Sequence, residues 1–171
     1  QLELFSKECL EHTQQVLQSV KEIADSNPDK LRGDFGFEEI EKADDMVYSV
    51  TDVIAAMVQY NSKVHLTEKH CQLQQDGPNY AGLVQIVKEI SEIMGTTPKD
   101  ADLRLQTNES LDSPYASGRA WSYMTCNEVG WFQTACGRLR PASLNLEYFA
   151  GICNELFGLG LADEAEKNRY F

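Results

Sequence analysis

The chain has 171 residues, of which 42% are hydrophobic and 25% charged, and its formal net charge is −12. This length and composition are typical of one soluble globular domain with its own hydrophobic core. The acidity argues against a nucleic-acid surface, which needs clustered lysine and arginine, and no apolar run approaches the roughly 18 residues that span a bilayer.

Hydrophobic periodicity predicts a mainly α fold of about four to six helices without a convincing strand. The first helix is expected from about Leu4 to Ala24, before a loop that contains Gly33 and Gly36 and tucks Phe35 and Phe37 inward. The later helices are expected at about 38–60, at 62–74, between the turn at 76–79 and Gly95, and from a cap at Ser143 to Gly158, with a weaker helical pattern at 161–171.

Two segments interrupt this pattern. Residues 96–118 are polar and rich in Pro, Ser, Thr and Asp, and we expect a long loop there. The segment WSYMTCNEVGWFQTAC, residues 121–136, has four aromatic residues and two cysteines and fits neither helical nor strand patterning well.

Catalytic and metal-binding motifs are not evident. A serine hydrolase of the α/β type needs glycines two residues to either side of its nucleophile, and no G-x-S-x-G occurs. His65, Glu68, His70 and Cys71 lie close in sequence, but two histidines five apart on a helix diverge by about 140°, so a solvated helix edge is favoured over a metal site. The sequence thus indicates no metal and no cofactor.

The acidic residues also give no clear catalytic motif. Carboxylate pairs such as Asp44-Asp45 are expected on exposed helix faces and need no catalytic explanation. Glu128 differs because it lies inside the aromatic segment. If it is partly buried, it is a candidate substrate-handling residue, and otherwise a structural hydrogen-bond acceptor.

The five cysteines match no zinc template, because no C-x-x-C pair occurs. They are either buried thiols in a reducing compartment or at most two disulfides with one cysteine left over. Asn108-Glu-Ser forms a glycosylation sequon, which has meaning only in the secretory pathway. The first residues lack the basic and apolar pattern of a signal peptide, so in an exported protein the signal would lie upstream.

Three stretches, in order, resemble the prolylcarboxypeptidase family of serine peptidases, which includes dipeptidyl peptidase II and thymus-specific serine protease. They are AMVQYN at 56–61, RAWSYMTCNEVGWFQ at 119–133 and CNELFG at 153–158. The second departs from the family pattern at Met124 and Asn127, where glutamine and threonine are usual.

The resemblance implies a helical cap, inserted into an α/β-hydrolase between the nucleophile and the Asp and His of the triad. Residues 1–118 would be the cap insertion and 119–171 a disulfide-tied aromatic return segment with C-terminal helices, together one compact unit. The catalytic residues would then lie before Gln1 and after Phe171, and the partner of this chain would be the catalytic core of the same polypeptide.

Further implications concern cysteines and substrate. The resemblance implies disulfides Cys126–Cys153 and Cys9–Cys136, with Cys71 free or paired outside the chain, in a secreted or lysosomal glycoprotein. It implies cleavage after proline, and leaves open whether the enzyme acts as a carboxypeptidase, a dipeptidyl peptidase or an endopeptidase. Trp131 would be the main residue near the proline ring, with Glu128 and Trp121 as supporting residues; alternatively both tryptophans belong to the core.

Two hypotheses therefore stand. The first is a substrate-gating cap of a post-proline serine peptidase, which forms an acyl-enzyme through a triad outside this chain. The second is a self-standing acidic helical interaction module without activity. A thiol count on the denatured, unreduced protein separates them, since the first predicts about one free cysteine and the second five.

Overall fold

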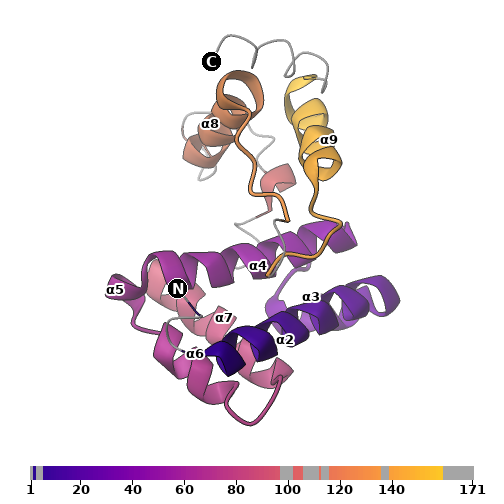
Figure 1. Cartoon of the computed structure of the whole chain (residues 1–171). Coiled ribbons are helices and arrows are strands. Elements are labelled where there is room, and N and C mark those ends of the chain that lie inside the picture. Colours follow the sequence, from indigo (N-terminus) through magenta and orange to yellow (C-terminus); the bar gives the residue numbers. More distant parts are fainter. Residues whose placement is uncertain are drawn as a thin grey trace.

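The computed structural model describes residues 2, 6–96, 102–105, 112, 116–135 and 139–159. These residues form eight α-helices with two short helical turns of other types and no strand, which confirms the mainly α prediction (Figure 1). Within them, no helix has the length and apolar character needed to cross a membrane.

Six α-helices precede the short helix η2 in the described residues, and α8 and α9 follow it. In order they are α2 (Lys7–Ser26), α3 (Pro28–Phe35), α4 (Ala43–Gln59), α5 (Asn61–Val64), α6 (Thr67–Leu73), α7 (Tyr80–Met94), η2 (Leu103–Leu105), α8 (Ala116–Met124), η3 (Thr125–Val129) and α9 (Leu146–Phe157). Figure 1 shows α8 and α9 beside each other on one side of α4, with the remaining α-helices on its other side.

The core lies between α2, α4 and α7. Each carries an apolar stripe at helical spacing, and the fully buried side chains of the stripes pack in one cluster. Val20, Met57 and Ile86 are buried members of the three stripes. Helix α4 is central, because its buried residues lie on most of its circumference.

The expected loop after the first helix is a helix, α3. Pro28 occupies its first turn and Gly36, in the left-handed conformation at φ +74°, ends it. Phe35 and Phe37 are buried, as expected, and their rings stack with centroids 5.5 Å apart. Gly36 is therefore the helix stop and not part of a loop.

The helix expected over 62–74 is broken in two at His65, which adopts φ +53° and ends α5. His65 is exposed, but His70 on α6 is completely buried and contacts Thr13 of α2. The solvated helix edge expected for His70 was therefore wrong, because α6 packs this side chain against α2.

The cysteine pairing differs from the one that the resemblance implied. Cys9 is bonded to Cys71, which joins α2 to α6, so the expected Cys9–Cys136 bond and the unpaired Cys71 were both wrong. Cys9 and Cys71 have Cα atoms 5.1 Å apart, within the reach of a disulfide. The Cys126–Cys153 bond between η3 and α9 is present, as implied. Cys136 lies outside the described residues.

Three further expectations meet the structure near the C-terminal helices. The stretch 96–118, expected as a loop, contains the short helix η2 and the first residues of α8, which begins at Ala116. The sequon at Asn108 and the weak helical pattern at 161–171 lie outside the described residues. Helix α9 is capped by Asn145, which accepts from the Tyr148 N–H at 3.0 Å, and not by Ser143. Gly158 ends α9 in the left-handed conformation, as predicted.

Candidate functional site

The aromatic segment is helical in its first half and reverses at a glycine. Helix α8 continues into the wider turn η3, and Gly130 at φ +62° then ends it by donating to the Thr125 carbonyl at 2.9 Å. The Cys126–Cys153 bond fixes η3 to α9. As a result the chain after Gly130 folds back along α8.

This reversal brings Trp131 against Trp121. Their ring centroids are 6.1 Å apart at an interplanar angle of 87°, an edge-to-face pair. The two side chains are 54% and 52% exposed, although they are among the largest apolar groups in the chain. The alternative that both tryptophans are core residues was therefore wrong.

A pocket of about 60 Å³ opens beside the tryptophan pair. Its floor includes the Cys126–Cys153 disulfide and the rings of Tyr48 and Phe149. The full lining consists of Tyr48, Leu103, Trp121, Ser122, Thr125, Cys126, Trp131, Phe132, Gln133, Phe149, Ile152 and Cys153. It is far smaller than a typical drug-sized site, so it suits one small apolar group.

Two polar side chains of the lining form hydrogen bonds within the protein. The Thr125 hydroxyl donates to the Ser122 carbonyl at 2.9 Å, and Gln133 Oε1 accepts from Arg140 at 2.6 Å. No carboxylate, histidine or lysine is found among the described residues that line it. The described lining is therefore mostly apolar, with a few neutral hydroxyl and amide groups and no charged side chain.

Glu128 does not belong to this pocket. The inner face of η3 is formed by Thr125 and Cys126, which are buried, whereas Glu128 is exposed. The partial burial considered for Glu128 was therefore wrong, because two positions beyond Cys126 the side chain lies on the other side of the turn. Its role in substrate handling stays a prediction.

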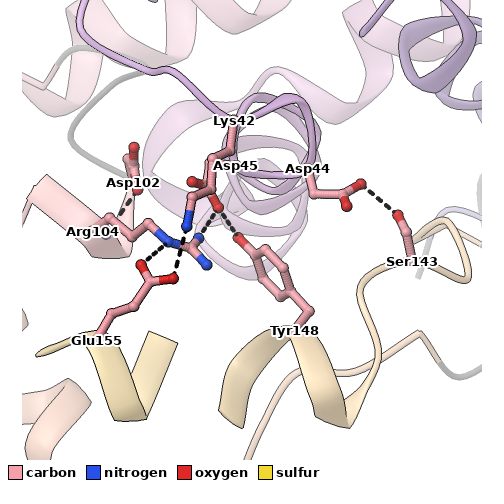
Figure 2. A network of polar contacts seen from close by, with 8 residues as sticks. All are labelled: Lys42, Asp44, Asp45, Asp102, Arg104, Ser143, Tyr148 and Glu155. Carbon is pink, nitrogen blue, oxygen red and sulfur yellow. Dashed lines mark hydrogen bonds and ion pairs between the residues drawn. The ribbon is translucent and has the colours of Figure 1, made fainter. Parts of the chain in front are cut away.

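A polar network centred on the buried Asp45 lies where η2 and α9 meet the start of α4 (Figure 2). Arg104 forms ion pairs through Nη1 with Asp45 and, at 2.6 Å, through Nε with Glu155. Lys42 donates to the other oxygen of Glu155 at 2.7 Å. The Asp45 side chain is only 2% exposed and Arg104 only 18%.

Asp45 also accepts a hydrogen bond from the Tyr148 hydroxyl at 2.9 Å. Burial raises the pKa of Asp45 to about 6, with the Arg104 guanidinium acting in the opposite direction. Hydrogen bonds from Arg104 and Lys42 lower the pKa of Glu155. Asp45 had been expected on an exposed face, and no sequence signal marks it, because only residues about 60 and 100 positions away bury it.

A second arginine ties the end of the aromatic segment to α4. Arg140 donates to Asp52 at 3.0 Å and to Gln133 at 2.6 Å, and its guanidinium lies 5.1 Å from the centre of the Tyr48 ring. Tyr48 and Gln133 both line the pocket. The residues that line the pocket are thus fixed by contacts with α4 as well as by the Cys126–Cys153 disulfide.

The chain is thus a helical domain with a small, mostly apolar pocket beside two exposed indoles. The family model described as Serine carboxypeptidase S28 matches residues 1–169. The chain therefore belongs to this family of serine peptidases, although no particular member of it is indicated. No curated protein and no solved structure matches the chain significantly.

Proposed function

We propose that this chain is the substrate-gating helical cap of a serine peptidase that cleaves after proline. The catalytic triad and the acyl-enzyme chemistry would be supplied by an α/β-hydrolase core of the same polypeptide. The observation that carries the proposal is the half-exposed pair Trp121 and Trp131 beside a small apolar pocket.

The pocket suits a proline ring for physical reasons. A pyrrolidine ring is compact and apolar, and perpendicular indoles offer it one face and one edge at little entropic cost. The small volume disfavours larger side chains. Membership of a serine peptidase family supports a peptide as the ligand.

The proposed compartment is secreted or lysosomal. Two disulfides need an oxidising environment to form and persist, and the structure contains two. With four of the five cysteines paired, a thiol count on the denatured, unreduced protein should find one free thiol. A count of five would instead support the acidic interaction module.

The test is Trp131→Ala in the full-length enzyme, assayed on peptides with proline or alanine before the scissile bond. We expect kcat/KM for the proline peptide to fall roughly 10- to 100-fold, as for a buried aromatic contact worth about 2 kcal/mol. The alanine peptide should change much less, because it fills little of the pocket.

Two controls accompany this test. Glu128→Gln should have a smaller effect than Trp131→Ala, because Glu128 does not line the pocket. The 171-residue chain alone should show no turnover. An unchanged preference for proline in Trp131→Ala, or turnover by the chain alone, would contradict the proposal.

A further inference from the structure

The short helix η2 forms one wall of the pocket from a segment that looks unstructured in sequence. Leu103 lines the pocket and packs against the hydrophobic core. Helix η2 contacts both α8 and α9, each of which contributes residues to the pocket lining. A single helical turn has little stability of its own, so its position depends on tertiary bonds.

Those bonds are made by the next residue, Arg104. Its guanidinium pairs with Asp45 of α4 and with Glu155 of α9, and lies 5.5 Å from the centre of the Tyr148 ring (Figure 2). Its backbone N–H donates to Asp102 at 2.8 Å. One partly buried side chain therefore connects η2 to two helices, and it directly follows the leucine that lines the pocket.

We propose that Leu103 determines which substrate side chain the pocket accepts, and that Arg104 is the positioning residue that holds Leu103 in place. This rests on the proposed function, in which the pocket binds the residue before the scissile bond. Leu103 limits the space to a group of the size of proline. Without its side chain, the pocket accommodates larger apolar residues such as leucine or phenylalanine.

Leu103→Ala in the full-length enzyme tests the first part. The ratio of kcat/KM for a phenylalanine peptide to that for a proline peptide should rise about tenfold, since each methylene in such a pocket changes selectivity by tenfold or more. Leu103→Phe should leave the proline peptide a poorer substrate. An unchanged ratio in both variants overturns the proposal.

Arg104→Met tests the second part, because it keeps the stem but removes every charged bond. The same ratio should shift in the same direction as in Leu103→Ala. In the double variant the two effects should not add, since Arg104 acts through Leu103. Arg104→Lys should restore the ratio only in part, because an ammonium lacks the planar fork that pairs with two carboxylates. Full additivity overturns the positioning role.

Arg32→Met is the matched control. Arg32 of α3 also makes three hydrogen bonds, to Asp29 and to the carbonyls of Ile40 and Glu41, but neither of its sequence neighbours lines the pocket. This variant should lose stability without any change in the ratio. A shift as large as that of Arg104→Met would mean that general destabilisation, and not positioning, causes the effect.

Tryptophan fluorescence tests the same inference without a substrate. The chain has two tryptophans, and both line the pocket. Acrylamide quenching of the 171-residue chain should increase in Leu103→Ala and Arg104→Met but not in Arg32→Met. If quenching increases in the two η2 variants but Trp131→Ala keeps the preference for proline, η2 does form a wall of the pocket and the proposed function is rejected. If Trp131→Ala loses the preference for proline, but quenching and the kcat/KM ratio are unchanged in Leu103→Ala and Arg104→Met, only the roles inferred for Leu103 and Arg104 are rejected.

Discussion

His70 is a neutral histidine enclosed between α6 and α2. Its Nε2 lies 2.8 Å from Thr13 Oγ1, whose proton is donated to the Cys9 carbonyl at 2.6 Å. Nε2 must therefore carry the proton, and the buried Nδ1 has no hydrogen-bond partner. Burial lowers the pKa of His70 to about 4, because a charged ring would have no water or counter-ion there.

This predicts a loss of stability in acid that is specific to His70. Its pKa in the folded chain lies below the unfolded value of 6.5, so the unfolded chain takes up the proton first as the pH falls. Relative to His70→Gln, the wild type should lose up to about 3 kcal/mol between pH 6.5 and pH 4, measured by urea unfolding.

His65→Asn is the control for this experiment. His65 is exposed at the C-terminal end of α5, and asparagine tolerates its positive φ. The pH profile of the stability of His65→Asn should therefore keep its wild-type shape. Parallel profiles for the wild type and His70→Gln would show that His70 titrates alike in the folded and unfolded chains.

At the level of elements, helices with a local apolar stripe could be predicted from sequence. The apolar stripes of α4 and α7 are formed by residues that lie close together in sequence, so their periodicity is evident there. Gly95 and Gly158 were expected as helix ends because glycine readily adopts the left-handed conformation, and both do so in the structure. The tryptophans of the pocket could likewise be singled out, because they stand in a motif that resembles a known family.

What the sequence could not show depends on distant residues. Asp45 is buried by Arg104 and Tyr148, far along the chain, and its own neighbours mimic an exposed acidic face. The partner of Cys9 depends on which helix packs against α2, and that helix is α6. Gly36 was misread because a helix stop and a loop glycine look alike in sequence.

The two disulfides stabilise different elements, which predicts different effects on removal. Cys126–Cys153 closes 27 residues and Cys9–Cys71 closes 62, so replacing each pair by serines should cost about 3 to 4 kcal/mol of unfolding free energy. Because Cys126 and Cys153 line the pocket, only their loss should also alter tryptophan fluorescence of the folded chain.

Urea unfolding and fluorescence emission spectra of the two serine pairs, recorded below the unfolding transition, check this. The Cys9–Cys71 pair is the control, since it joins α2 and α6 away from the pocket lining. Equal spectral changes in both would contradict the assignment of Cys126–Cys153 as the support of the tryptophan pair.

At the scale of the whole molecule, α4 connects the helical core to the pocket. Tyr48 packs edge-to-face against Phe149 of α9 with ring centroids 5.8 Å apart, and Ser143 donates to Asp44 at 2.7 Å. Arg104 and Arg140 add ion pairs to Asp45 and Asp52. The junction is therefore rich in charge, so its stability should depend on pH.

Asp45 predicts the direction of that dependence. Its folded pKa, about 6, lies above the unfolded value of 3.8, so the folded chain holds the proton more tightly. The stability that Asp45 contributes is complete below pH 4 and is lost as the pH rises through 6. Relative to Asp45→Asn, the wild type should therefore gain about 2 kcal/mol between pH 6.5 and pH 4.

This gain opposes the loss from His70 over nearly the same range, so the two contributions largely cancel in the wild type. Urea unfolding from pH 4 to pH 7 should then show His70→Gln becoming relatively more stable in acid and Asp45→Asn relatively less stable. If Asp45→Asn instead gained on the wild type as the pH fell, the Arg104 pair would outweigh burial and hold the pKa of Asp45 below its ordinary value. The charged and titratable groups that face Asp45 are Arg104, Asp102, Lys42 and Tyr148, and all of them are still present in Asp45→Asn. The difference in unfolding free energy between the wild type and this variant therefore measures the contribution of Asp45 in its native surroundings.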